Sequence, residues 1–126
     1  MTFPAGARTT CYIFTRDRAA AARFYKEILG FRHTATEDFA DTFDLGDVTM
    51  RIVPMKDFKP SAHTVLGWEV KDIAAEVKAL SAKGVTFLVY ENYGQDELGI
   101  WNSPDGRAKL AWFLDADGNN LCLAQH

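Results

Sequence analysis

The feature that most constrains the fold is an internal repeat. Residues 8–15 are rich in β-branched and aromatic side chains and predict a strand, which leads to Asp17, a candidate helix N-cap. Residues 63–70 predict another strand that leads in the same way to Asp72, 55 positions after Asp17. A chain that repeats a strand and a capped helix at this spacing is expected to fold as two similar modules.

Each expected helix closes at a glycine, Gly30 in the first and Gly84 in the second, and both suit a left-handed C-cap. Both modules therefore share the order strand, helix, glycine, strand. The helical spacing of apolar residues predicts one buried face per helix, formed by Ala21, Phe24, Tyr25 and Ile28 in the first and by Ile73, Val77 and Leu80 in the second.

Short strands and turns fill the rest of each module. Asp-Gly between two apolar runs is a strong hairpin signal, and Asp117-Gly118 lies at the centre of a closing hairpin at 107–124. The pattern predicts a single α+β domain over 1–126, with two βαβββ modules at about 8–54 and about 62–124. An α+β sandwich without symmetry is the alternative. The other strands are expected at 31–37, 39–45, 48–54, 85–90 and 99–103.

Composition excludes several classes of function. The 126 residues carry a net charge of −3 and no cluster of Lys or Arg, so nucleic acid is not an expected partner. No apolar run is long enough to span a membrane, and the first residues show no secretory signal. Cys11 and Cys122 match no metal or redox spacing, so we expect free thiols and a cytoplasmic location, with a disulfide as the alternative.

Three segments together resemble the vicinal oxygen chelate superfamily. They are FTRD…RFYKEILGF between 14 and 31, WEVKDIAAEVKALSAKGV at 68–85, and AWFLDADGNNLCLAQ at 111–125, where Ala116 stands in place of the usual proline. The family includes glyoxalase I, extradiol dioxygenases, and bleomycin and fosfomycin resistance proteins. The resemblance implies a glyoxalase-like fold, in which the sheets of two βαβββ modules curl into a cup with the helices outside and the ligand inside. It also implies a homodimer.

Enzymes of this family typically bind a divalent metal through side chains on the first and fourth strands of each module. The resemblance carries these positions to Thr10, Arg51, Val65 and Cys122. Divalent metals need oxygen, imidazole or thiolate ligands, and an arginine repels a cation. We therefore expect no metal and no other cofactor. A divalent metal is the alternative, if a β-bulge brings His63 into the position of Val65.

Strand alternation indicates which side chains would face the cup. If Thr10 points inward, Tyr12 and Phe14 do so as well, whereas Met50 and Ile52 pack beneath the helix. The alternative role for the aromatic residues is ordinary core packing, and for Arg51 it is a solvated sheet face. The expected ligand-binding residues are Thr10, Tyr12, Phe14, Arg51, His63, Val65, Tyr90, Trp101, Trp112 and Cys122.

An aromatic pocket with one cation suits a small planar or anionic organic molecule. The sequence therefore predicts a protein that binds such a molecule without metal. We expect Arg51 to lie within reach of Trp112 and to receive an anionic or carbonyl group of the ligand. The alternative is a glyoxalase-type lyase or dioxygenase-like enzyme, with a divalent metal or a metal-independent mechanism.

Overall fold

The computed structural model describes residues 2–126. The chain divides between Phe58 and Lys59 into two compact units. The predicted module at 8–54 lies in the first unit and the predicted module at 62–124 in the second, and their union in a single domain stays a prediction. Within residues 2–126, no helix has both the length and the apolar character needed to cross a lipid bilayer.

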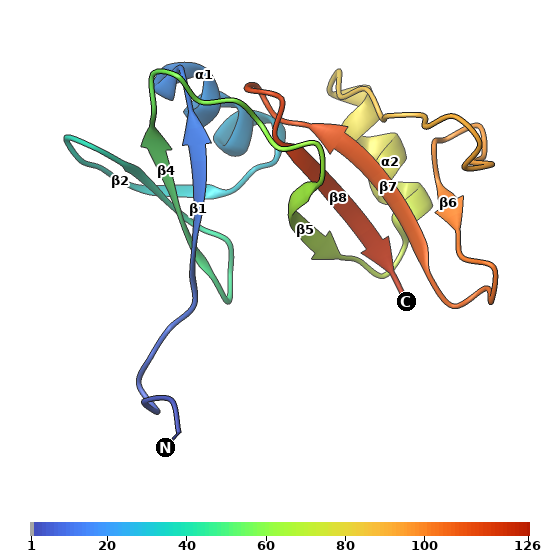
Figure 1. Ribbon diagram of the computed structural model, residues 1–126, viewed down its shortest axis with the longest axis horizontal. Helices are drawn as coiled ribbons and strands as arrows, with labels where there is room; N and C mark the ends of the chain where they lie inside the picture. The colour runs from blue at the N-terminus through green and yellow to red at the C-terminus, as the bar shows by residue number, and fades with distance from the viewer. Residues whose placement is uncertain (1) are drawn as a thin grey trace. The chain divides into compact units, whose positions relative to one another are not determined.

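The first unit combines one four-stranded mixed sheet with one helical segment (Figure 1). Its strand order is β1-β4-β3-β2, in which β1 and β4 are parallel and the other neighbours are antiparallel. In chain order its elements are β1 (Thr10–Thr15), α1 (Arg18–Arg23), the π-helical turn η1 (Phe24–Ile28), β2 (Arg32–Thr36), β3 (Asp41–Asp44) and β4 (Thr49–Pro54).

The second unit repeats this arrangement. Its strand order is β5-β8-β7-β6, again with the first and last strands of the module parallel. The matching strand orders confirm the predicted α+β fold of two βαβββ modules, and neither sheet closes into a barrel. In chain order its elements are β5 (Thr64–Glu69), α2 (Ile73–Ala82), β6 (Trp101–Asn102), β7 (Lys109–Leu114) and β8 (Asn120–Gln125).

The two helices begin on equivalent aspartates. The Oδ1 atom of Asp17 accepts a hydrogen bond from the Ala20 N–H at 3.1 Å, and Oδ1 of Asp72 accepts one from the Ala75 N–H at 3.1 Å. Each carboxylate satisfies one of the N–H groups that the first helical turn leaves unpaired. Both predicted N-caps are confirmed.

The span from the capping aspartate to the closing glycine is one residue longer in the first module than in the second. The turn η1 accommodates the extra residue, because there the Leu29 N–H donates to the oxygen of Phe24, five residues back, at 3.1 Å. Both helical segments still end at a glycine with positive φ, 78° at Gly30 and 95° at Gly84. The predicted left-handed C-caps are therefore confirmed.

Each helix packs on one face of its own sheet and leaves the opposite face open (Figure 1). The burial of Met50 and Ile52, both 0% exposed, agrees with their predicted place beneath the first helix. In β4, and likewise in β7 of the second unit, the residues that alternate with the buried ones remain at least partly exposed, as strand geometry requires. The core between helix and sheet consists of Ile13, Ala21, Tyr25, Phe43, Met50 and Ile52 in the first unit, and Ile73, Val77, Ala111, Phe113, Leu121 and Leu123 in the second.

The predicted strand at 85–90 does not form. Only Phe87 makes a β-bridge, to Phe113, and the Leu88 N–H donates to the oxygen of Trp112 at 2.8 Å. The short strand β6 pairs with the remaining part of the same edge of β7. Two segments share this edge, and neither has enough of it to form a full strand.

We expect alanine at Gly30 or Gly84 to destabilise the protein by about 1 kcal/mol, because a residue with Cβ is costly in the left-handed region. A Cβ at either site would meet nothing within 4 Å, so the cost is conformational rather than steric. Gly6→Ala is the matched control, since Gly6 also has open space but no positive φ. Chemical denaturation measures the free energy of unfolding, and equal values for the three variants would contradict this prediction.

Candidate functional site

Several of the predicted aromatic residues gather on the open face of the second sheet. The register pairs Trp112 of β7 with Cys122 of β8, and Cys122 with Gly67 of β5. Trp101 of β6 pairs with Leu110, two residues before Trp112. Because side chains alternate along a strand, these positions share the face opposite α2.

Trp112 is the centre of an aromatic cluster on this face. Its ring centroid lies 5.3 Å from that of Tyr90, 5.9 Å from that of Tyr93 and 6.4 Å from that of Trp101. Both tyrosine rings meet Trp112 edge to face, at 78° and 81°. This is a favoured geometry for aromatic pairs. An open hollow of about 440 Å³ is lined by Asn92, Tyr93, Trp101, Leu110 and Trp112.

The amide of one side chain holds the loop that carries the two tyrosines. Gln95 Nε2 donates to the oxygens of Leu88 and Gly99, at 2.8 and 2.7 Å. Its Oε1 accepts from the Tyr90 N–H at 2.6 Å. In the same loop Asn92 has a φ of 67°, a conformation that asparagine tolerates better than most residues. Gln95 thus supplies the hydrogen bonds that a neighbouring strand would otherwise make.

A second amide fixes the side chain of Tyr90. Asn120 Nδ2 donates to the Tyr90 hydroxyl at 2.9 Å, and Asn120 Oδ1 accepts from the Thr64 hydroxyl at 2.9 Å. Asn120 is only 4% exposed, so these hydrogen bonds satisfy a polar group that would otherwise be costly to bury. The Tyr90 ring is therefore held against Trp112 by polar contacts as well as by packing.

The predicted site residue Cys122 lies beside Trp112 in the register, with its thiol half-buried. Burial raises the pKa of the Cys122 thiol, so the group is protonated at neutral pH and is a poor nucleophile. A Cβ at Gly67 would lie 2.7 Å from the Cys122 Sγ. Glycine at this position lets β5 and β8 pair without displacing the thiol.

The open face of the first sheet carries another group of predicted residues. The parallel register of β1 and β4 places Tyr12 directly beside Arg51. Alternation puts Thr10 and Phe14 on the same face as Tyr12, as predicted. The Tyr12 side chain is 58% exposed, whereas the Phe14 ring packs 5.8 Å from the ring of Phe58.

The Arg51 guanidinium is already paired within its own unit. Its Nη2 lies 3.1 Å from Glu37 Oε1, and its Cζ lies 5.9 Å from the ring centroid of Phe39. Sequence reasoning missed both partners, which come from the loop between β2 and β3 and carry no motif. Arg51 and Trp112 belong to different units, and their proximity stays a prediction.

Arg18 of α1 holds the loop that carries Glu37. Its guanidinium donates to the backbone oxygens of residues 37, 38 and 40 and, at 2.8 Å, to Oδ2 of Asp41. Burial alone would raise the pKa of Asp41, but hydrogen bonds from Arg18 and Thr36 oppose it and the pKa is lowered. An ionised Asp41 therefore holds Arg18, and Arg18 places Glu37 within reach of Arg51.

Of the remaining predicted residues, His63 lies just before β5 and Val65 at an irregular part of it. The pairing register shifts at Val65, so a β-bulge breaks the expected alternation. Val65 is 42% exposed, and His63 Nδ1 lies 2.7 Å from the hydroxyl of Ser61. Thr64, rather than Val65, bonds across to β8 on the open face.

The positions that resemble metal ligands do not fit a divalent metal. Thr10 offers a hydroxyl, Arg51 a cation, Val65 no polar atom and Cys122 a single thiol. Divalent metals prefer carboxylate, imidazole or thiolate. In the part of the chain that the structure describes, no three His, Cys, Asp or Glu side chains gather as a metal site would require.

A family model described as the glyoxalase/bleomycin resistance protein/dioxygenase superfamily matches residues 7–123. The protein therefore belongs to this superfamily, as the three segments predict. Members of the superfamily bind small molecules, and many use a divalent metal. No curated protein matches the sequence.

Solved structures share the fold at low sequence identity. A putative glyoxalase family protein from Bacillus anthracis is 14% identical, with a TM-score of 0.75, over 100% of this chain and 99% of its own. TnmS3, an antibiotic binding protein from Streptomyces sp. CB03234, is 21% identical, with a TM-score of 0.74, over 98% of each chain. Lactoylglutathione lyase from Agrobacterium tumefaciens is 13% identical, with a TM-score of 0.72, over 97% of this chain and 95% of its own. Identities this low show the fold alone.

Proposed function

We propose that the protein binds a planar aromatic small molecule against the Trp112 cluster, without a metal. The observation that carries this proposal is the set of rings held around Trp112 over an open hollow of about 440 Å³. That volume is in the range of small-molecule sites, and their walls are typically aromatic with a few polar groups. The two supporting amides, Gln95 and Asn120, keep the rings in place before a ligand arrives, which lowers the ordering cost of binding.

The similarity to an antibiotic binding protein supports a binding role, since TnmS3 has the same fold. The similarity to a lactoylglutathione lyase supports the alternative, a lyase or dioxygenase-like enzyme. The side chains at the positions that resemble metal ligands favour a binding role over an enzymatic one. They do not fit the metal on which such enzymes typically depend, since they are Thr10, Arg51, Val65 and Cys122. All ten predicted site residues remain candidates for ligand contact.

We further propose that Arg51 receives an anionic or carbonyl group of the ligand. Its guanidinium keeps donors beyond the one given to Glu37, and Tyr12 beside it provides an exposed ring for stacking. Glu37 would then compete with an anionic ligand for Arg51. Neutral carbonyl groups, which need only one donor, would not have to displace Glu37.

Replacing Trp112 with leucine should weaken binding of planar compounds about tenfold or more, because stacking surface is lost while apolar volume is kept. A thermal-shift screen of polycyclic aromatic compounds identifies a ligand, and titration of the variant measures the loss. Val89→Ala is the control, since Val89 is 74% exposed and lies outside the hollow. Equal affinity in the wild type and both variants would reject the aromatic site.

Arg51→Leu should weaken binding of a carboxylated planar compound about tenfold, whereas Glu37→Gln should strengthen it by releasing the guanidinium. The uncharged parent compound, bound through its rings, serves as the control and should bind both variants equally. Titration of the wild type and of each variant with both compounds measures the difference in affinity. If the carboxylated compound binds both variants with the wild-type affinity, Arg51 is not part of the site.

Protein purified without chelator should contain divalent metal well below one ion per chain, because the positions that resemble metal ligands offer no suitable donor set. Elemental analysis by plasma mass spectrometry measures the content. Addition of EDTA should leave ligand affinity unchanged. One bound ion per chain, lost together with ligand binding on chelation, would favour the enzymatic alternative.

We propose a homodimer, since the sheets end in edge strands and the chain exposes large apolar side chains, among them Phe39 at 64% and Val89 at 74%. Association between copies would cover such edges and side chains. Sedimentation equilibrium should give twice the chain mass at micromolar concentration. A single species of monomer mass would refute this proposal.

A further inference from the structure

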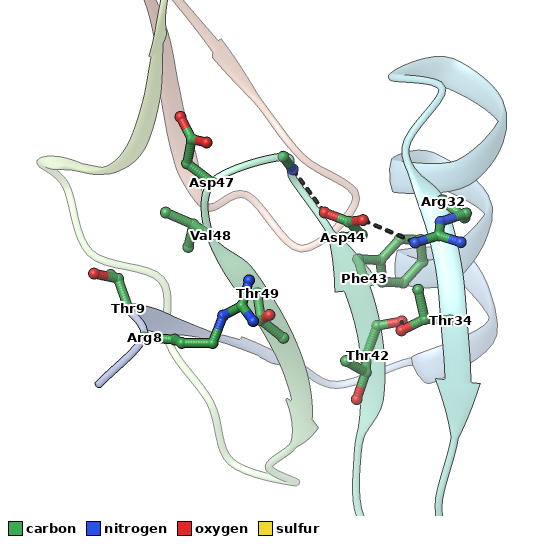
Figure 2. A pocket seen from close by; sticks show the side chains of 11 residues that line it. Arg8, Thr9, Arg32, Thr34, Thr42, Phe43, Asp44, Asp47, Val48 and Thr49 are labelled. Atoms are coloured by element: carbon green, nitrogen blue, oxygen red, sulfur yellow. Dashed lines mark hydrogen bonds and ion pairs between the residues drawn. The ribbon is translucent and has the colours of Figure 1, made fainter. Parts of the chain in front are cut away.

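The first unit contains a polar hollow of its own, about 390 Å³ in volume. It lies near the turn that joins β3 to β4, and Figure 2 shows side chains of β2, β3 and β4 around it. Two arginines, Arg8 and Arg32, and the three strand threonines Thr34, Thr42 and Thr49 line it. Guanidinium and hydroxyl groups are donors, so this lining is equipped to bind an acceptor.

Arg32 makes an exposed ion pair with a carboxylate that also accepts a backbone hydrogen bond. Arg32 Nη2 lies 2.9 Å from Asp44 Oδ2, and Asp44 Oδ1 accepts from the Gly46 N–H at 2.8 Å (Figure 2). The hydrogen bond from Gly46 and the one from Arg32 lower the pKa of Asp44. Each carboxylate oxygen accepts one hydrogen bond, and the rest of the Arg32 guanidinium makes no other hydrogen bond with residues 2–126.

Arg8 has no such partner. Its guanidinium makes no hydrogen bond or ion pair with residues 2–126, and only longer-range attraction links it to Asp44. Figure 2 shows it beside Thr49, on the opposite side of the hollow from Arg32. The second acidic residue of the lining, Asp47, points away from Thr42 in the same view. Two cations and two carboxylates therefore line the hollow. Asp44 is already paired with Arg32, which leaves Arg8 as the arginine of the lining that has no partner among residues 2–126.

We propose that this hollow binds a small oxyanion group, a phosphate or a carboxylate, between Arg8 and Arg32. Guanidinium groups bind such oxygens in pairs through parallel N–H donors. The Thr49 hydroxyl can donate to a remaining oxygen, whereas the Thr34 hydroxyl already donates to the Thr42 oxygen and the Thr42 hydroxyl to Glu37 Oε1. The site is open to solvent, so its affinity should fall as ionic strength rises. This proposal concerns the first unit and does not depend on a ligand at the Trp112 cluster.

Titration with inorganic phosphate and, separately, with acetate tests the site directly. Amide resonances of Thr42 and Thr49 are followed by NMR at constant ionic strength, with chloride as the reference anion. We expect saturable shifts with at least one oxyanion, and the stronger binder identifies the group that the hollow prefers. Absence of saturable shifts with both oxyanions, or equal shifts with chloride, would overturn the proposal.

Variants test whether the two arginines of the hollow bind the oxyanion, or whether any positive charge on the surface has the same effect. Arg8→Gln and Arg32→Gln should each weaken oxyanion binding about tenfold, since each removes a charge-assisted contact. Arg23→Gln, an exposed arginine of α1 outside the hollow, is the matched control and should bind as the wild type does. Because Arg8 makes no described hydrogen bond, Arg8→Gln should keep the wild-type melting temperature. Equal affinities in all three variants would refute the site.

Discussion

The rest of the structure depends on one constraint, which is where each sheet places the two strands that come first along the chain. β1 and β2 lie at opposite edges of one sheet and run in the same direction, as do β5 and β6 in the other. Strands so related cannot be joined by a tight turn, so the connection must cross the sheet, and in both units it does so through a helix. That crossing covers one face of each sheet and leaves the other free for a ligand.

A ligand can bind an open sheet face only if the side chains there are fixed in position, and the two units fix theirs by different hydrogen bonds. In the second unit, the amides of Gln95 and Asn120 brace an aromatic loop that lacks a full strand of its own. In the first unit, the ion pair of the partly exposed Arg18 with the buried Asp41 fixes the loop that brings Glu37 to Arg51. The open face of the second unit is therefore mainly aromatic, whereas that of the first combines the charge of Arg51 with the rings of Tyr12 and Phe14, although the underlying strand orders match.

Features set by local interactions could be predicted from the sequence, and features set by competition between distant segments could not. The caps at Asp17 and Asp72 depend on a few consecutive residues, so residue type and spacing reveal them. Residues 85–90 have the composition of a strand, but another segment occupies part of the edge that they need. The pairing of Arg51 with Glu37 depends on a third residue far along the chain and leaves no local pattern.

The widened turn η1 shows how duplicated halves can drift in length without losing their shared plan. In a regular α-helix of 3.6 residues per turn, one added residue would rotate every later side chain away from its partner. A single π-helical turn absorbs the addition, just as register shifts in β2 and β5 absorb irregularities in the strands. Insertions of this kind disturb residue-by-residue alignment far more than they disturb backbone geometry. Recognition of such chains by shape should therefore persist long after recognition by sequence has faded.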